Sequence, residues 1–292
     1  MYMVMIMDVQ SPRIQLVFIT YNRLAYTSLA LASILADPSE FFNLTIWDNA
    51  STDGTVEYLR KEVNDPRIDD IIFSQKNVGQ TSAINTIWGG SKADLLGKLD
   101  NDCLMTPGWT RNLAKAHMDI ARLGVIACWH YPLDEFDEEA ARRAGKIQEY
   151  GNHKILRHPW TCGTGLLIKR ETFRQFGPIQ GKATTQYWLH MALKGYVNGY
   201  YYPLVRQEHM DDPRSKHSLL YDDESIIKRR HMSVVLSNNN IRTMKELWRR
   251  RRRILYNLNS GPWEPRCYVG WRGKIRSLVA KVRDVRAFRW KE

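Results

Sequence analysis

The segment GKLDNDCLM, residues 97–105, places Asp100, Asn101 and Asp102 in a row directly after an apolar stretch. Asp and Asn are good turn formers because their side chains hydrogen-bond to the nearby backbone, so one interpretation is a plain turn. The other interpretation is a metal site, because carboxylate oxygens are the ligands that hard divalent cations prefer. The segment alone does not distinguish a turn from a metal site. The predicted strands and helices around it provide the further evidence.

Apolar strands and helices alternate along the chain up to this segment. The strands are short runs rich in β-branched residues and bounded by polar ones, and between them apolar residues recur at helical spacing. The predicted strands are residues 14–20, 42–48, 69–74 and 93–100, and the predicted helices are residues 24–35, 56–63 and 80–90. This alternation is typical of an α/β fold in which helices flank a doubly wound, mostly parallel sheet.

Polar side chains follow each of the four predicted strands. They are Thr20, Tyr21 and Asn22 after the first strand, Asp48 and Asn49 after the second, Asn77 after the third, and Asp100 to Asp102 after the fourth. Ligands of doubly wound sheets bind at the carboxyl ends of the strands, so we expect these side chains to converge on one rim. That convergence favours a metal site at Asp102.

A nucleotide is the ligand that this rim suits best. Mg²⁺ or Mn²⁺ at Asp102 would lie between the carboxylates and an anionic diphosphate, and Asp48 would hydrogen-bond to the ribose or the base. No GxGxxG follows the first strand and no GxxxxGK[ST] occurs, so a dinucleotide-binding domain and a P-loop are both disfavoured.

Four segments, FITYNR, IWDNASTDGT, NVGQTSAIN and KLDND, occur in an order and spacing that resemble the nucleotide-sugar-binding half of a family 2 glycosyltransferase of the GT-A fold. The resemblance continues through TCGTGLLIKRETFRQFG at residues 161–177 and covers residues 14 to 215. It implies transfer of a sugar from a nucleoside diphosphate-sugar donor to a glycan or glycolipid acceptor in cell-surface glycan assembly. It also implies a divalent metal cofactor, Mn²⁺ or Mg²⁺.

The resemblance assigns a role to each polar position. It makes Asp100-Asn101-Asp102 the DxD motif, with Asp102 as metal ligand, and matches His209 to a histidine that completes the metal site in some relatives. It assigns nucleotide-sugar contacts to Thr20, Tyr21, Asn22, Asp48, Asn77, Asp100 and Asn101. Structural roles are the alternatives: turn formation for the Asp and Asn residues, rim packing for Tyr21 and a structural hydrogen bond for His209.

The catalytic base departs from the pattern of the family. Inverting members usually place an acidic residue at the start of the helix that here begins near YWLHMALKGY, but Ala183-Thr184-Thr185-Gln186 stand at this position. The nearest downstream acids are Glu208, Asp211 and Asp212. Three interpretations follow: Asp211 or Asp212 is the base, the enzyme retains configuration and needs no carboxylate here, or the protein binds nucleotide sugars without catalysis. A nucleotidyltransferase on a related fold is a further alternative, although TYNR is unlike a GxGxR phosphate loop.

Charge divides the chain into two parts. Residues 241–292 hold 16 Lys and Arg against 4 Asp and Glu, and the first 240 residues hold 27 of each, so the formal charge of +12 lies in the C-terminal part. Residues 247–258 and 274–290 show helical spacing of apolar residues with a basic opposite face. We therefore predict a GT-A-like domain at 1–240 and a basic amphipathic helical segment at 241–292 that binds an anionic membrane surface. Packing on the body or in a homo-oligomer is the alternative, and nucleic acid is the least favoured partner.

The cysteines and the hydropathy of the sequence indicate the cellular compartment in which we expect the protein. The four cysteines are scattered without a CxxC spacing, which disfavours a zinc site and fits a reducing cytoplasm. No stretch approaches the length of a membrane span, and the opening MYMVMIM lacks the basic region of a signal peptide. We expect a cytoplasmic protein, peripheral on the inner face of the membrane through residues 241–292.

Overall fold

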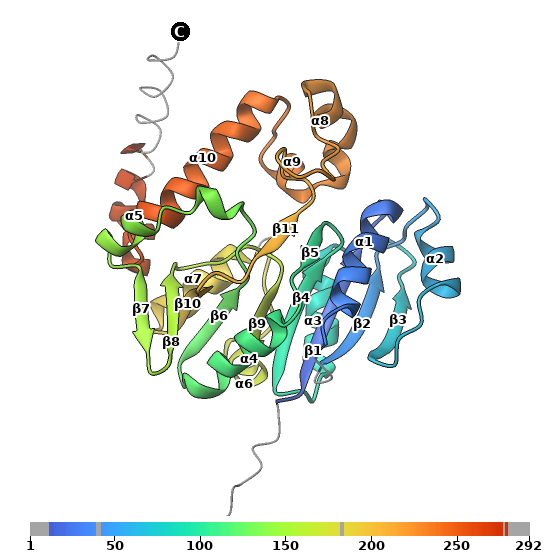
Figure 1. Ribbon diagram of the computed structural model, residues 1–292, viewed down its shortest axis with the longest axis horizontal. Coiled ribbons are helices and arrows are strands. Elements are labelled where there is room, and N and C mark those ends of the chain that lie inside the picture. The colour runs from blue at the N-terminus through green and yellow to red at the C-terminus, as the bar shows by residue number, and fades with distance from the viewer. Residues whose placement is uncertain (1–11, 39–41, 182–183, 277, 280–292) are drawn as a thin grey trace, which may run out of the picture.

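The computed structural model of the protein describes residues 12–38, 42–181, 184–276 and 278–279. Its main sheet has the strand order β3-β2-β1-β4-β9-β6-β10-β8-β7 (Figure 1). The strands are β1 (Ile14–Thr20), β2 (Phe42–Asp48), β3 (Ile68–Phe73), β4 (Leu95–Asp100), β6 (Leu123–Ala127), β7 (Ile147–Tyr150), β8 (His153–Arg157), β9 (Leu166–Lys169) and β10 (Val197–Tyr202). Strands β1 to β4 are mutually parallel, whereas β9 lies antiparallel between β4 and β6. The prediction of a mostly parallel α/β sheet is confirmed.

Helices cover both faces of this sheet. Successive residues of a strand point to opposite faces, so Leu16 and Phe18 of β1 join one core, and Val17 and Ile19 join the other. Burial on both faces explains why β1 is apolar throughout. The first layer contains α1 (Leu24–Leu35), α2 (Thr55–Lys61) and α4 (Trp109–Asp119), and the second contains α3 (Gln80–Gly90), α6 (Arg170–Phe176) and α7 (Thr185–Leu193).

A two-stranded sheet extends from the rim of the main sheet. Strand β5 (Cys103–Met105) leaves the DND segment and pairs antiparallel with β11 (Gln207–His209). The register sets His209 directly opposite Cys103. This pairing brings a residue from the far end of the domain next to Asp102.

The C-terminal region is helical and lies against the body (Figure 1). It contains α8 (Asp223–Arg229), α9 (Val234–Asn238) and α10 (Met244–Ser260), with 3₁₀ helices η2 (Arg230–Met232) and η3 (Pro265–Tyr268). A third apolar cluster runs from Leu220 to Leu247, and Leu258 of α10 joins the second core of the body. A capping box at Thr243 and Glu246 begins α10.

The predicted helix at 247–258 lies inside α10. Residues 270–276 are also helical, but most of the helix predicted at 274–290 falls outside the described residues. In the part of the chain that the structure describes, every helix is too short or too polar to cross a membrane.

Candidate functional site

The register of the parallel strands places the predicted polar residues along one rim. Thr20 pairs with Asp48, and the residue before Thr20 pairs with Asp100. The buried Asn101 then joins the first and fourth strand ends, because its Nδ2 donates to Thr20 Oγ1 at 3.2 Å and to the Asn22 carbonyl at 3.0 Å. The structure therefore brings these residues together, and Tyr21, the residue after Thr20, is half-buried.

Asp48 is buried at the end of β2, with 1% of its surface exposed. Its Oδ2 accepts a hydrogen bond from the Ser51 amide at 3.0 Å, whereas Oδ1 has no partner among the described residues. An unsatisfied buried polar oxygen costs about 1–3 kcal/mol, so Asp48 Oδ1 requires a partner such as a water or a ligand. A donor such as a nucleobase N–H would satisfy this oxygen.

Asn77 lies exposed in the loop after β3. Its Oδ1 accepts a hydrogen bond from the Gly79 amide at 2.9 Å, and the neighbouring Val78 amide donates to Asn49 Oδ1 at 3.0 Å. Asn77 therefore has a turn-forming role, and Asn49 fastens this loop to the end of β2.

Lys98 is a site residue that the sequence reasoning missed. Its Nζ donates to Asp100 Oδ2 at 2.5 Å and to Gln80 Oε1 at 2.8 Å, and its side chain is 1% exposed. Burial raises the pKa of Asp100, and the Lys98 charge opposes that shift. The signal in the sequence was a lone cation inside the apolar strand LLGKLD, because a buried lysine requires a partner.

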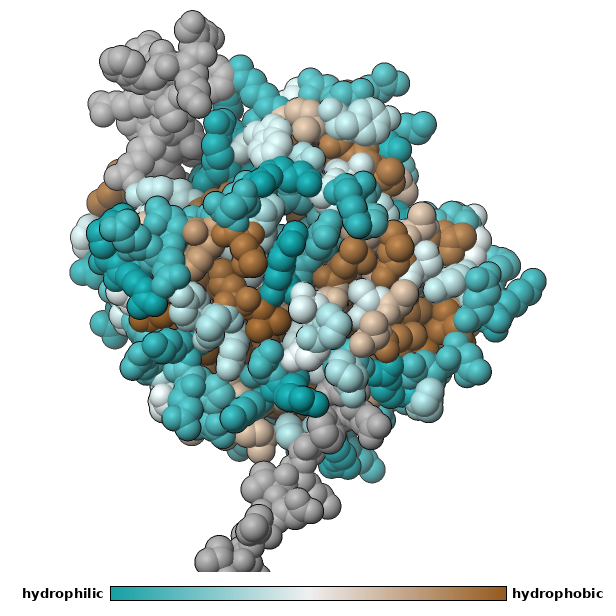
Figure 2. Space-filling view, in the orientation of Figure 1, coloured by the Kyte–Doolittle hydropathy of each residue, from teal (hydrophilic) through white to brown (hydrophobic). Residues whose placement is uncertain are grey.

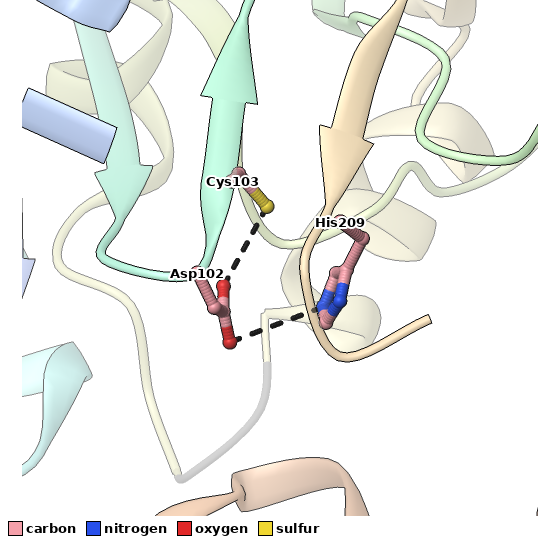
Figure 3. A group of neighbouring side chains, drawn as sticks. All are labelled: Asp102, Cys103 and His209. Carbon is pink, nitrogen blue, oxygen red and sulfur yellow. Dashed lines mark hydrogen bonds and ion pairs between the residues drawn. The ribbon is translucent and has the colours of Figure 1, made fainter. Parts of the chain in front are cut away.

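The turn between β4 and β5 and the end of β11 form a cluster of potential metal ligands. One ligand atom each from Asp102, Cys103 and His209 lie within 4.8 Å of one another, and Asp102 Oδ2 is 4.0 Å from His209 Nε2 (Figure 3). Burial raises the pKa of the Cys103 thiol well above its ordinary value, and Cys103 Sγ donates to Asp102 Oδ1 at 3.5 Å. Cys103 therefore acts as a hydrogen-bond donor. The Asp102 carboxylate fits a hard divalent cation, and the His209 imidazole is a less usual ligand for such an ion.

Arg23, the last residue of TYNR, also belongs to this cluster. Its guanidinium donates to Asp102 Oδ2 at 3.3 Å and to Asp211 Oδ1 at 2.6 Å, and it lies 4.3 Å from the centre of the Tyr26 ring. Burial by itself raises the pKa of Asp102. The electrostatic effects of His209 and Arg23 act in the opposite direction, and the net shift of the pKa is downward. Asp102 is thereby held in its anionic form.

The two predicted bases, Asp211 and Asp212, face different partners. Asp211 pairs with Arg23 and so lies on the metal side, and burial raises its pKa. Asp212 Oδ1 instead accepts from Arg251 of α10 at 2.6 Å and from the Arg214 amide at 2.9 Å. Arg23 therefore connects Asp211, but not Asp212, to the potential metal ligand Asp102.

His130 is a second residue that the sequence reasoning missed, and no motif marks it. Its ring centre lies 5.8 Å from that of His209, and its Nδ1 lacks a hydrogen-bond partner in the described part of the chain. Burial lowers the pKa of His130 to about 3, so the imidazole is neutral. A neutral imidazole beside His209 can accept a hydrogen bond from a ligand.

The segment that replaces the usual acidic position lies before α7. Thr184 is buried and α7 begins at Thr185, while Ala183 lies outside the described residues.

Two tryptophans in this part of the structure pack against other side chains. Trp188 of α7 is fully buried in the second core, and Trp160 packs edge-on against Tyr268 at 4.6 Å between ring centres. Trp188 is therefore a core residue.

The family model for Glycosyl transferase family 2 matches residues 16–177, more than half of the chain, so the protein belongs to this family. The resemblance predicted from the sequence is confirmed. The search of curated proteins finds no match.

Two solved structures show a similar fold. One is the mannosyltransferase PcManGT from Pyrobaculum calidifontis in complex with GDP-Man and Mn²⁺, with a TM-score of 0.57 and 20% identity over 77% of this chain and 63% of that chain. The other is GalNAc-T7 with UDP, GalNAc and Mn²⁺, with a TM-score of 0.50 and 14% identity over 69% of this chain and 44% of that chain. This chain thus spans less than two thirds of the length of either protein.

Proposed function

We propose that the protein is a metal-dependent glycosyltransferase that moves a sugar from a nucleoside diphosphate-sugar donor to an acceptor hydroxyl. The observation that carries the proposal is the rim of a family 2 domain on which the unpaired Asp48 oxygen and the Asp102–His209 pair lie together. The two similar structures, which contain Mn²⁺ and a nucleotide or nucleotide sugar, support the same chemistry.

Different residues of the rim bind different parts of the donor. Asp48 accepts from the base, with Thr20, Tyr21 and Asn22 beside it, and Asp100 and Asn101 lie next to the ribose and diphosphate. Asp102 and His209 would hold Mn²⁺ or Mg²⁺, which when bound neutralises the charge that develops on the leaving diphosphate. Asn77 shapes the loop at the end of β3.

Asp211 is the residue that we propose as the catalytic base. Sugar hydroxyls are poor nucleophiles at neutral pH, and a carboxylate with a raised pKa accepts their proton more effectively. Asp211 has such a pKa because it is buried, and its pairing with Arg23 places it on the same side as Asp102. Asp212 is the alternative within the same turn, and a retaining mechanism is the alternative to both.

We also propose that the acceptor is a glycan or glycolipid and that the C-terminal segment binds an anionic membrane surface. Exposed apolar residues in this segment recur at helical spacing, and Arg272 and Lys274 lie among them. Such a combination suits an interfacial helix. The exposed apolar residues are Trp271, Ile275, Leu278 and Val279.

Donor binding and turnover test the proposed function. The purified protein is titrated by calorimetry with UDP, GDP, dTDP and CMP sugars in Mn²⁺ and again in EDTA, and hydrolysis or transfer of the bound donor is then followed. Metal-dependent binding with turnover supports the proposal. Binding without turnover on any acceptor supports a nucleotide-sugar-binding protein instead, and metal-independent binding contradicts the metal role.

A further inference from the structure

The five consecutive arginines of α10 do not share one environment. The side chain of Arg251 is 6% exposed, whereas Arg252 and Arg253 are exposed. Arginine is rarely buried without a partner, so the one that points inward is placed there by specific contacts. Arg251 is the buried member of the run, whereas Arg250 is half-buried and donates to Asn239 Oδ1 at 2.8 Å.

The guanidinium of Arg251 joins three segments of the chain. Its Nη1 donates to Asp212 Oδ1 at 2.6 Å and its Nη2 donates to Glu135 Oε2 at 2.5 Å. It also lies 5.6 Å from the ring centre of Tyr131 and 5.2 Å from that of Trp248. One buried cation thus links α10 to the 3₁₀ helix η1 (Leu133–Glu135) and to the turn after β11.

That turn, residues 209–212, carries the proposed metal ligand and the proposed base. The Met210 amide donates to the Asp102 carbonyl at 2.7 Å, and the Asp212 amide donates to the His209 carbonyl at 2.9 Å. The turn is therefore held to the DND segment at one end and to Arg251 at the other. Asp211 lies between these two attachments, and His209 directly precedes the first.

We infer that Arg251 is a positioning residue, which fixes the 209–212 turn so that His209 and Asp211 face Asp102. The basic C-terminal helix is then a structural part of the site. The inference rests on the proposed function for the roles of His209 and Asp211. Removal of the guanidinium takes away the cation that Asp212 and Glu135 share. Glu135 keeps its ion pair with Arg214 at 3.0 Å, whereas the Asp212 carboxylate loses its cationic partner, so the turn loses its attachment to α10.

Hydrogen exchange tests the attachment without any ligand. In Arg251→Met the amides of Met210 and Asp212 should exchange at least about 10-fold faster than in the wild type, because their bonds depend on the position of the turn. In the matched control Arg252→Met, which changes an exposed neighbour, they should exchange at the wild-type rate. Equal exchange in both variants and the wild type overturns the inference.

The Mn²⁺ requirement tests the connection to the site. The Mn²⁺ concentration that half-saturates the binding of UDP or GDP should rise at least about 10-fold in Arg251→Met. Arg251→Lys should recover part of the loss, since lysine restores the charge but not the bidentate geometry of the guanidinium. A double variant, Arg251→Met with Glu135→Gln, removes the negative charge beside Asp212, and its Mn²⁺ requirement should stay as high as in Arg251→Met because the turn still lacks its attachment to α10.

The possible results separate the inference from the proposed function. Faster exchange with an unchanged Mn²⁺ requirement shows that Arg251 holds the turn without serving the site, and it overturns the positioning role. If the wild type itself binds UDP and GDP without any dependence on Mn²⁺, the proposed metal role fails, and the positioning of His209 as a metal ligand fails with it.

Discussion

Arg23 Nη1 lies 3.3 Å from Asp102 Oδ2, the same carboxylate oxygen that faces His209 Nε2 at 4.0 Å. A protein cation therefore already neutralises the carboxylate that the proposed metal needs. The other arm of the guanidinium holds Asp211 at 2.6 Å, so Arg23 ties the proposed metal ligand to the proposed base. A metal at the proposed site would compete with Arg23 for this oxygen.

Arg23→Met should bind Mn²⁺ more tightly than the wild type in the absence of nucleotide. The competing charge-assisted hydrogen bond contributes about 1.5–3 kcal/mol, which corresponds to an affinity gain of about 10-fold or more. Calorimetric titration with MnCl₂ measures it. Arg60→Met, which changes an exposed arginine elsewhere, serves as the control, and an unchanged or weaker affinity in Arg23→Met would contradict the competition.

Asp102→Ala should abolish the Mn²⁺ dependence of nucleotide diphosphate binding, because it removes the carboxylate of the proposed site. Cys103→Ala should keep that dependence, since the thiol donates a hydrogen bond to Asp102 Oδ1 and a soft sulfur ligand is a poor match for Mn²⁺ or Mg²⁺. Calorimetry with and without EDTA distinguishes the two variants. Normal metal-dependent binding in Asp102→Ala would show that the metal lies elsewhere.

Asp211→Asn should keep nucleotide affinity and lose about 10²-fold in kcat, as expected for removal of a general base. Asp212→Asn should lose less, because an asparagine still accepts the hydrogen bond from Arg251. Steady-state turnover of the donor gives both values. Full activity of Asp211→Asn removes it from the mechanism, and the anomeric configuration of the product, read by NMR, then tests the retaining alternative.

The full chain should sediment with anionic vesicles and be released by salt, with each basic residue near the surface contributing about 1 kcal/mol. Trp271→Ser with Leu278→Ser should reduce the bound fraction, because both side chains are exposed, at 67% and 61%. Tyr221→Ser, an equally exposed aromatic outside the segment, is the control. Equal sedimentation of all three proteins would indicate that this segment does not bind the membrane.

Stability should fall as the pH drops below 6.5. Burial lowers the pKa of His117 from 6.5 to about 3 in the folded protein, so the unfolded chain takes up this proton first and stability is lost between these two values. At pH 5 His117 contributes about 2 kcal/mol to the loss, and His130 and His158, whose pKa values burial also lowers to about 3, add to it. Urea unfolding at pH 7.5 and 5 should show a smaller decrease for His117→Gln than for the wild type, and the exposed control His190→Gln should keep the wild-type decrease.

The sequence by itself determined the elements and the rim. The apolar run of β1, the helical spacing after it and the polar residues at the four strand ends are local patterns. Up to the end of β4 the structure forms strands and helices within a residue or two of the predicted ends. A parallel sheet then requires that its strand ends share an edge, so Thr20, Asp48 and Asp100 had to meet.

Only the tertiary structure decided which charges meet at that rim. Arg23 contacts Asp102 across 79 positions of the chain and Asp211 across 188, and Arg251 reaches Glu135 across 116. Local patterns do not contain such pairs, because they depend on the antiparallel pairing of β5 with β11 and on the way α10 packs against the body. The direction in which one of five identical arginines points is set by that packing and by the partners it meets.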